Sequence, residues 1–275
     1  MAGTALVAGL GFMGGSLALA LRAAGWRVRL WHHRDGVAAE AAAGGLGEPG
    51  ALDGAWDVAI ACAPVGALPG LCATLAGLGL ATDVGSTKAA LCAALAGPLA
   101  AGRFVGSHPM CGSHRTGWRH AEAGLYRDAT VVVCAGHDRA QATVADLWRS
   151  LGCRVVAMAP AEHDRAVAVA SHLPHLCAGL AAGGLAGADG SAVALAASGF
   201  RDTTRVAGGC PELWADILLD NRAEVLAAMR DARGRLDALA AALDAGDRAG
   251  VAAWLERARA GRARFDARRI SPAGG

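Results

Sequence analysis

The sequence is almost free of lysine. Lys88 is the only lysine among the 275 residues, so nearly all positive charge comes from arginine. Its retention points to a specific chemical need at that position, unless it survives by chance. The net charge of +2 at pH 7 gives no reason to expect nucleic acid or an anionic membrane as a partner.

Long apolar runs and a leader segment are also absent from the pattern. Although 54% of the residues are hydrophobic, Arg, Asp, His or clusters of Gly interrupt every apolar stretch. We therefore expect no membrane-spanning segment and no membrane partner. The first strand pattern begins at Ala5, which leaves no room for a signal peptide. These absences predict a cytoplasmic protein.

No C-x-x-C pair occurs among the cysteines. Scattered cysteines in a cytoplasmic protein are most often small buried apolar residues, so we expect neither disulfides nor a zinc cluster. The eight cysteines are Cys62, Cys72, Cys92, Cys111, Cys134, Cys153, Cys177 and Cys210.

The most informative stretch is LVAGLGFMGG, residues 6–15. An apolar run is followed by Gly9, Gly11 and Gly14 in the spacing G-x-G-x-x-G, and then by a helical pattern. In such a strand–turn–helix the glycines allow a sharp turn, a close approach of a pyrophosphate and tight packing of helix on strand. The helix N-terminus then attracts the phosphates. The pattern predicts a dinucleotide site; the alternative is an ordinary tight turn.

Strand and helix patterns alternate up to residue 159. This alternation predicts the α/β class, with a doubly wound, Rossmann-type parallel sheet and helices on both faces. The expected strands are 5–8, 27–31, 57–62, 78–83, 103–106, 130–134 and 154–158, and the expected helices include 13–24, 37–43, 67–76 and 139–150.

From residue 160 onward there is no convincing strand pattern. The expected helices are 162–182, 191–207, 211–236 and 248–268, and they carry Ala and Leu on more than one side. Helices of this kind pack around each other or around a partner chain. We therefore expect a dinucleotide-binding domain over 1–159, and an all-helical domain over 160–275 through which the chain forms a homodimer.

The end of the second expected strand bears on the choice between NAD and NADP. In dinucleotide folds an acidic residue there favours the 2′-hydroxyl of NAD, and an arginine favours the 2′-phosphate of NADP. Arg34 falls at that place beside His33, and Asp35 follows one residue later. The count favours NADP and leaves NAD open.

Polar residues follow two further strands, at the edge where ligands bind in an open parallel sheet. Ser86 lies in the segment DVGSTK and His108 in the segment SHPMCG. A histidine is the usual proton acceptor near neutral pH, and a hydroxyl can orient it. We expect Ser86 and His108 to meet beside the nicotinamide; the alternative for His108 is a turn residue that caps backbone groups.

Two histidines in the helical half, His172 and His175, lie three residues apart. A metal site would need a third ligand, and His163 lies two turns or more away, so we expect no metal.

Arginines form a second cluster in the helical half. Arg201 and Arg205 suit the binding of a carboxylate, and the alternative is a surface ion pair between one of them and Asp202. Trp214 follows on the next helix and fits a core or interface position.

As a set, these motifs resemble the prephenate/arogenate dehydrogenase family of tyrosine biosynthesis. The shared segments occur in the family's order and cover nearly the whole chain. They are GLGFMGGS (9–16), DVGSTK (83–88), GSHPMCG (106–112), SHLPH (171–175) and GFRDTTR (199–205), with Trp214 and Asp216.

The resemblance implies the oxidative decarboxylation of a cyclohexadienol with a nicotinamide cofactor. It implies that His108 accepts the proton of the ring hydroxyl, that Ser86 holds both in place and that Arg205 binds a carboxylate. The implied substrate-binding residues are His172, His175, Arg205, Trp214 and His114. The implied cofactor-binding residues are Gly9, Gly11, Phe12, Met13, Gly14, His33, Arg34, Pro64, Asp83 and Lys88.

The chain departs from the family pattern at His114, where many members have Glu. If His114 lies near the substrate side chain, it favours the keto acid prephenate over arogenate, which carries an ammonium. We expect a prephenate dehydrogenase that yields 4-hydroxyphenylpyruvate; the alternative is an arogenate (cyclohexadienyl) dehydrogenase that yields tyrosine directly.

Two further classes of protein stay open. β-Hydroxyacid dehydrogenases share a loop like GLGFMG and a helical second half, but they use a lysine in that half, and here no lysine exists beyond Lys88. A regulator that binds NADP without chemistry would not need the ordered set of Ser86, His108 and Arg205.

Overall fold

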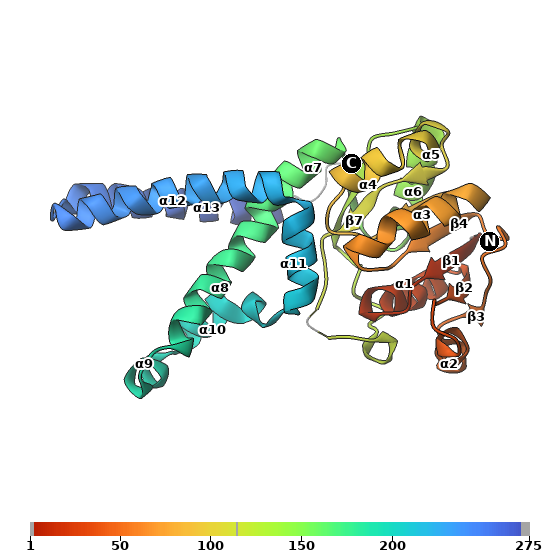
Figure 1. Ribbon diagram of the computed structural model, residues 1–275, viewed down its shortest axis with the longest axis horizontal. Coiled ribbons are helices and arrows are strands. Elements are labelled where there is room, and N and C mark those ends of the chain that lie inside the picture. The colour runs from red at the N-terminus through yellow and green to blue at the C-terminus, as the bar shows by residue number, and fades with distance from the viewer. Residues whose placement is uncertain (1–2, 114, 271–275) are drawn as a thin grey trace. The chain divides into compact units, whose positions relative to one another are not determined.

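In the computed structural model, which describes residues 3–113 and 115–270, the first part of the chain forms a six-stranded parallel sheet (Figure 1). The strand order is β3-β2-β1-β4-β5-β6. The order reverses between β1 and β4, the place where doubly wound sheets bind ligands, so the predicted fold class is confirmed. The strands are β1 (Thr4–Ala8), β2 (Arg27–Trp31), β3 (Glu48–Pro49), β4 (Val58–Ala61), β5 (Ala81–Asp83) and β6 (Phe104–Val105).

The central strand β1 contributes to two apolar cores. Val7 packs in one cluster with Leu21, and Leu6 packs in the other with Leu75. Successive side chains of a strand point to opposite faces, so one buried strand supports helices on both sides of the sheet. The helices of this half are α1 (Phe12–Ala23), α2 (Val37–Ala43), α3 (Leu68–Leu78), α4 (Ala89–Ala94), α5 (Ala96–Ala100) and α6 (Asp138–Ser150), with the 3₁₀ helices η1 (Val65–Ala67) and η2 (Trp118–His120).

The strands predicted at 130–134 and 154–158 form, but in a separate sheet. Its order is β7 (Ser107–Pro109), β8 (Thr130–Cys134) and β9 (Arg154–Met158), and β7 runs antiparallel to β8. The chain leaves the main sheet at Gly106, whose carbonyl accepts a hydrogen bond from the Cys134 N–H at 2.8 Å. The expectation that all of these strands belong to one parallel sheet was therefore wrong.

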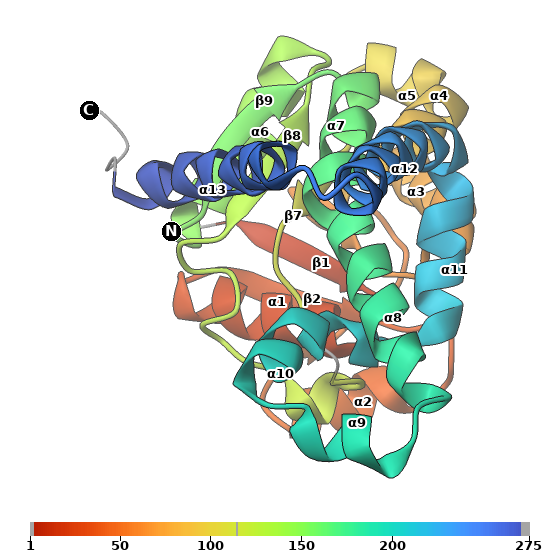
Figure 2. The same ribbon diagram turned by 90° about the vertical axis from the view of Figure 1, so that its left-hand side faces the viewer.

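The described residues after Met158 contain no strand. Their helices are α7 (Pro160–Val167), the π-helical turn η3 (Ala168–His172), α8 (Leu173–Ala186), α9 (Gly190–Leu195), α10 (Ser198–Thr204), the 3₁₀ turn η4 (Arg205–Gly208), α11 (Pro211–Asp220), α12 (Arg222–Asp244) and α13 (Arg248–Ile270). Helix α10 lies against α8 (Figure 2). The single helices predicted over 191–207 and 211–236 are each interrupted, at Ala196–Ala197 and at Asn221.

The segments α7, η3 and α8 form one helical stretch with a wide turn at its centre. Pro174 has no N–H to continue the regular ladder, which accounts for a local departure from α geometry just before it. By length and composition alone, residues Pro160–Ala186 are apolar enough to cross a membrane, and 22% of their most apolar window is buried. This finding contradicts the expectation that no apolar stretch is long enough.

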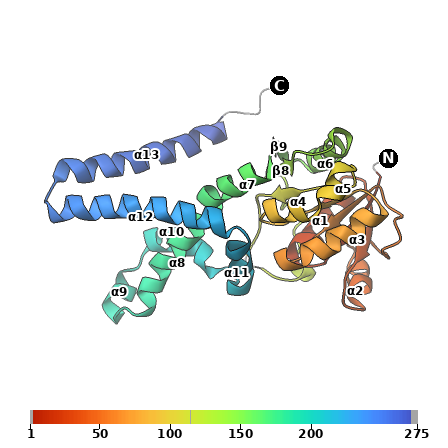
Figure 3. The same cartoon turned by 45° about the horizontal axis from the view of Figure 1, so that its top comes forward.

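The chain divides into two compact units, residues 1–225 and 226–275. Helices α7 to α11 thus pack within the same unit as the two sheets. In the second unit, α12 and α13 run side by side as a hairpin (Figure 3), and Trp254 Nε1 donates a hydrogen bond to the Arg235 carbonyl at 2.9 Å. The domain boundary expected at 159/160 stays a prediction.

Candidate active site

The loop between β1 and α1 requires two of its glycines for packing and leaves the third open. Gly9 has φ +105°, and a Cβ there would lie 2.1 Å from the Cys62 carbonyl oxygen. A Cβ on Gly14 would lie 1.9 Å from the Gly9 oxygen. At Gly11 a Cβ would meet no atom within 4 Å. The loop is therefore closed against β4 and open on the side where a ligand can approach.

The N-terminus of α1 is available to an anion. Gly11 is its N-cap and offers no side-chain cap, and the first backbone bond of the helix comes from the Gly15 N–H to the Gly11 oxygen at 2.9 Å. Among described residues, nothing accepts from the N–H groups of Phe12, Met13 and Gly14. Three N–H groups at a positive helix end fit a pyrophosphate. The Phe12 side chain itself is buried and can contribute only its backbone.

The far end of this edge carries exposed polar side chains. His33, Arg34 and Asp35 are exposed after β2, and Arg34 makes no ion pair with a described residue. The Arg34 N–H donates to His32 Nδ1 at 3.0 Å, which fixes the turn. Pro64 is exposed beyond β4. The arrangement leaves an exposed guanidinium just after β2.

Asp83 and Lys88 do not line this edge. Their side chains are fully buried and form an ion pair with each other, so the expectation that they contact the cofactor directly needs correction. Asp83 also accepts from the Gly85 N–H at 2.8 Å and the Ser107 N–H at 3.0 Å. The pair therefore fastens the segments that carry Ser86 and His108.

The Ser107 hydroxyl strengthens the same anchor. It lies 2.8 Å from Thr82 Oγ1 and 2.5 Å from the Asp83 carbonyl oxygen, and it accepts from Trp148 Nε1 at 3.1 Å. With all of these groups buried, β7 starts from a rigid point.

His108 follows directly and is 8% exposed. Burial, then the nearby His163, Lys88 and His172, hold the pKa of His108 well below its usual value. The imidazole therefore stays neutral and keeps a lone pair for a proton. Its Nδ1 lies 2.8 Å from His163 Nε2, which leaves Nε2 as the atom that can meet a substrate.

His163 and Asp164 form the support behind His108. His163 Nδ1 lies 2.7 Å from Asp164 Oδ1, and His163 is completely buried. The sequence had suggested His163 only as a remote metal ligand, and Asp164 was not considered. The available signal in the sequence was that His163 and Asp164 are adjacent near the start of α7, the helix that follows the last strand, where the chain passes the edge of the sheet.

Ser86 occupies the loop between β5 and α4 and is half-buried. Its hydroxyl makes no hydrogen bond with a described residue, and the group that orients His108 is His163. The expectation that the Ser86 hydroxyl orients His108 is therefore not supported by a hydrogen bond among the described residues, and a role of Ser86 toward the substrate or cofactor stays a prediction.

Three rings from the helical half meet at α8 and α11. His175 stacks on Trp214 with ring centroids 3.5 Å apart, and His172 meets the edge of Trp214 at 6.1 Å. A Cβ on Gly209 would lie 2.7 Å from Trp214 Nε1, so the stack requires glycine there. His175 Nδ1 is buried without a hydrogen-bond partner among the described residues, which marks it as a group that can receive a ligand.

His172 lies deeper than expected. It is 1% exposed, its Nδ1 lies 3.3 Å from Asn221 Nδ2, and burial lowers its pKa to about 4. It supports the stack from behind and is not itself on a surface that a substrate can reach.

The two arginines of the helical half differ in their partners. Arg201 Nε lies 3.1 Å from Asp202 Oδ1, an exposed ion pair. Arg205 begins η4, is exposed and has no ion-pair partner in the described part of the chain. It can therefore bind a carboxylate. His114 lies outside the described residues.

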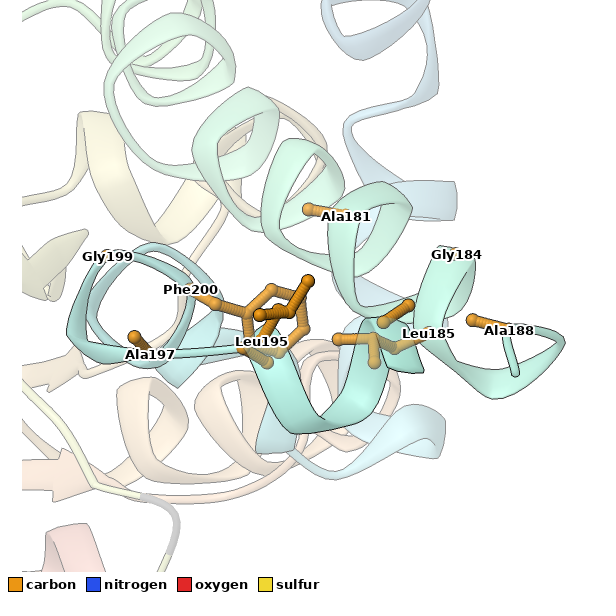
Figure 4. Close-up of a pocket in the computed structure, with 10 residues that line it drawn as sticks. Ala181, Gly184, Leu185, Ala188, Leu195, Ala197, Gly199 and Phe200 are labelled. Atoms are coloured by element: carbon orange, nitrogen blue, oxygen red, sulfur yellow. The ribbon is translucent and has the colours of Figure 1, made fainter. Parts of the chain in front are cut away.

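A large hollow lies elsewhere, between α8, α9 and α10 (Figure 4), with a volume of about 520 Å³. Its lining is apolar, with Leu185, Leu195 and Phe200 as the largest side chains, so it carries no groups for chemistry. Within the ranges 3–113 and 115–270, no three His, Cys, Asp or Glu residues are grouped to hold a metal ion.

Comparison with known proteins identifies curated relatives of this chain. The curated prephenate dehydrogenase of Bacillus subtilis is 34% identical over 246 residues, which cover 82% of this chain and 66% of that protein. The cyclohexadienyl dehydrogenase of Zymomonas mobilis is 34% identical over 182 residues, which cover 62% of each. The chain thus spans less than two thirds of the length of these curated relatives.

Solved structures show the same architecture. Prephenate dehydrogenase from Aquifex aeolicus, in complex with hydroxyphenyl propionate and NAD⁺, has a TM-score of 0.85 at 26% identity, covering 96% of this chain and 98% of that one. Synechocystis arogenate dehydrogenase has a TM-score of 0.79 at 29% identity, covering 95% and 99%.

The family models match most of the chain. The model of the prephenate dehydrogenase nucleotide-binding domain matches residues 17–157, and that of the prephenate dehydrogenase dimerization domain matches residues 159–257. These matches leave the β-hydroxyacid dehydrogenase alternative without support. Because these two models together match most of the chain, the chain belongs to the prephenate dehydrogenase family.

Proposed function

We propose that the protein is a prephenate dehydrogenase, which converts prephenate to 4-hydroxyphenylpyruvate and carbon dioxide with NAD(P). The observation that carries the proposal is the neutral, buried His108 on β7, which the Ser107 N–H fastens to Asp83 at the end of β5, in the sheet whose glycine loop fits a dinucleotide. Two relatives with prephenate dehydrogenase and cyclohexadienyl dehydrogenase activity in their names support the same chemistry.

The chemistry divides between the cofactor and the chain. When bound, the nicotinamide supplies the acceptor for the hydride that leaves the ring carbon bearing the hydroxyl. His108 Nε2 accepts the hydroxyl proton, so that this oxygen becomes a carbonyl as the hydride departs. The open face at Gly11 and the first N–H groups of α1 would bind the pyrophosphate of the cofactor.

Decarboxylation completes the reaction. The ring carboxylate leaves as carbon dioxide, and the electrons of the broken C–C bond make the ring aromatic. The former hydroxyl oxygen then regains a proton to give the phenol. The enzyme therefore holds the hydroxyl proton only during the reaction and gives it back to the same oxygen, and the overall reaction neither releases nor takes up a proton.

Substrate binding falls to the helical half. We assign the carboxylate to Arg205, which is exposed and lacks an ion-pair partner among described residues. His175 offers a buried nitrogen without a partner in the same part of the chain, and Trp214 provides a flat wall stacked on it. His172 keeps both rings in place from behind.

The same half supports a homodimer. Leu180 is 73% exposed and Leu195 is 82% exposed, and Leu195 lines the apolar hollow of Figure 4. Apolar surface of this kind on a dimerization domain fits burial against a second copy. A cytoplasmic location stays a prediction.

The deciding experiment is a steady-state matrix of prephenate and arogenate against NAD and NADP, read at the absorbance of the reduced nicotinamide. Turnover of prephenate to 4-hydroxyphenylpyruvate supports the proposal. Turnover of arogenate alone assigns the arogenate dehydrogenase activity instead. Binding of NADP with no turnover of either substrate supports the non-catalytic regulator.

We further propose a preference for NADP, because Arg34 is exposed beside His33 where a 2′-phosphate would lie. Arg34→Ala should weaken the binding of NADP and leave that of NAD unchanged. Arg139→Ala, at an exposed arginine on α6, is the matched control. Equal losses for both cofactors would place Arg34 away from the phosphate.

A further inference from the structure

Three side chains, His108, His163 and Asp164, form a series of hydrogen bonds that leads from His108 into the interior of the protein. His108 Nδ1 lies 2.8 Å from His163 Nε2, and His163 Nδ1 lies 2.7 Å from Asp164 Oδ1. His163 has no exposed surface and Asp164 is 4% exposed. A proton that enters this series from the substrate side therefore has no direct way out to solvent.

The hydrogen bonds determine where the protons lie at rest. Burial raises the pKa of Asp164, but hydrogen bonds from His163 and from the N–H groups of Ala89 and Lys88 outweigh it, and the net pKa is lowered. An ionised Asp164 can only accept, so His163 carries a proton on Nδ1, and in that neutral tautomer it presents a lone pair at Nε2. His108 must then donate from Nδ1, which leaves its Nε2 lone pair for the substrate.

Asp164 is held so that it cannot turn away. Its Oδ1 accepts from the Lys88 N–H and its Oδ2 from the Ala89 N–H, both at 2.8 Å, at the start of α4. Asn221 Nδ2 donates to the Asp164 carbonyl at 2.8 Å. The negative charge therefore has a fixed position beside the far nitrogen of His163.

A positive charge is unfavourable on His108 itself. Burial lowers the pKa of His108, and the nearby His163, Lys88 and His172 lower it further. On His163 the same charge lies directly against the carboxylate of Asp164. The reaction proposed above needs a place that holds one proton through hydride transfer and decarboxylation and then returns it.

We propose that His163 is a positioning residue that also stores the substrate's proton during the reaction, with Asp164 as its counter-ion. When His108 Nε2 takes the hydroxyl proton, the proton between the two rings moves from His108 Nδ1 to His163 Nε2. His108 is then neutral again, and His163 is positive beside Asp164. After carbon dioxide leaves, both protons move back and the ring oxygen becomes a phenol. This inference rests on the proposed function.

The resting arrangement can be tested without turnover. In ¹⁵N-histidine NMR spectra of the intact protein at pH 7, His108 and His163 should both be neutral with the proton on Nδ1. Assignments come from loss of signals in His163→Gln and His108→Asn. A proton on His163 Nε2 in the resting protein would overturn the proposal, whatever the substrate is.

The storage step is tested by single turnover with enzyme in excess over prephenate, in mixtures of H₂O and D₂O. In the wild type the rate should fall as a curved function of the deuterium fraction, since two protons move together. In His163→Gln, the side-chain oxygen still accepts from His108 but cannot take up a proton. Its rate should fall by about tenfold or more, with a linear dependence.

His137→Gln, the same change at an exposed histidine, is the control and should match the wild type. If His163→Gln has the wild-type rate and a curved dependence on the deuterium fraction, His163 does not store the proton and the storage step is wrong. If His163→Gln fails to fold, a linear dependence in the wild type overturns the proposal by itself. Absence of any turnover in the wild type refutes the proposed function, and the NMR result still decides the proton positions.

Discussion

Replacing Lys88 by methionine is expected to destabilise the protein by about 3–5 kcal/mol. Methionine keeps an unbranched side chain of similar length but removes the ammonium that contacts Asp83. Both side chains are fully buried, so no water can take the place of the lost partner. The Asp83 carboxylate would be left as a buried charge without a counter-ion.

The structure also sets a limit on the loss. The Asp83 carboxylate would keep the N–H groups of Gly85 and Ser107 as donors, at 2.8 and 3.0 Å. Removing one partner of a buried pair is far more harmful than removing both, because the harm lies in the uncompensated charge. Lys88→Met combined with Asp83→Asn should therefore be more stable than Lys88→Met alone, because the uncompensated charge is gone. It should still be less stable than the wild type, because an asparagine oxygen can accept from only one of the two N–H groups.

The measurement is urea unfolding followed by far-UV circular dichroism, which reports the whole fold, because the fluorescence of seven tryptophans would not isolate the buried Trp148 beside Ser107. Arg119→Met is the matched control, because the ion pair of Arg119 with Glu40 has side chains 65% and 58% exposed. That change should cost less than about 1 kcal/mol. If Lys88→Met costs no more than Arg119→Met, or if the double variant is the least stable, the argument from burial is wrong.

Four further outcomes are expected. His108→Asn should lower kcat by about a hundredfold or more and leave cofactor binding intact in a fluorescence titration; an unchanged kcat would remove it as the base. Arg205→Ala should raise the KM for the substrate, and an effect on cofactor affinity alone would contradict its assignment. Gly209→Ala, which forces a Cβ to within 2.7 Å of the stacked indole, should raise the same KM severalfold with little change in global stability. Burial lowers the pKa of His172 from 6.5 to about 4 in the folded protein, so its contribution to stability is present above pH 6.5 and is lost as the pH falls toward 4. Between pH 6.5 and 4, the unfolding free energy of His172→Gln should therefore fall less steeply than that of the wild type. Parallel plots of unfolding free energy against pH for the two proteins would contradict the shift.

Much of the fold follows from local patterns. The elements Arg27–Trp31, Val37–Ala43, Thr130–Cys134 and Arg154–Met158 have the predicted bounds, because apolar periodicity and glycine ends define each of them locally. The three-residue strand β7 was missed for the opposite reason. The start of β7 is held by the hydrogen bond from the Ser107 N–H to Asp83, 24 residues away in the sequence. The apolar periodicity of residues 107–109 cannot predict a contact with so distant a residue.

The site shows the same division. The glycine loop and the placement of His108 after a strand were predictable because each depends on residues that are neighbours in sequence. The partnership of His108 with His163 spans 55 residues and depends on the first turn of α7 meeting the edge of the sheet. Likewise, Lys88 was expected at the cofactor, whereas its role as the partner of a buried aspartate depends on the interior that the fold creates.

The single lysine has a practical consequence for chemistry on this protein. Because the ε-ammonium of Lys88 is completely enclosed and engaged by Asp83, the folded molecule presents no lysine to amine-directed reagents. Acylating agents, amine cross-linkers and lysine-modifying enzymes would find at most an α-amino group. Acylation of Lys88 requires the buried surroundings of the Lys88–Asp83 ion pair to open. The rate of that one modification, followed by mass spectrometry, therefore measures how often this part of the interior opens.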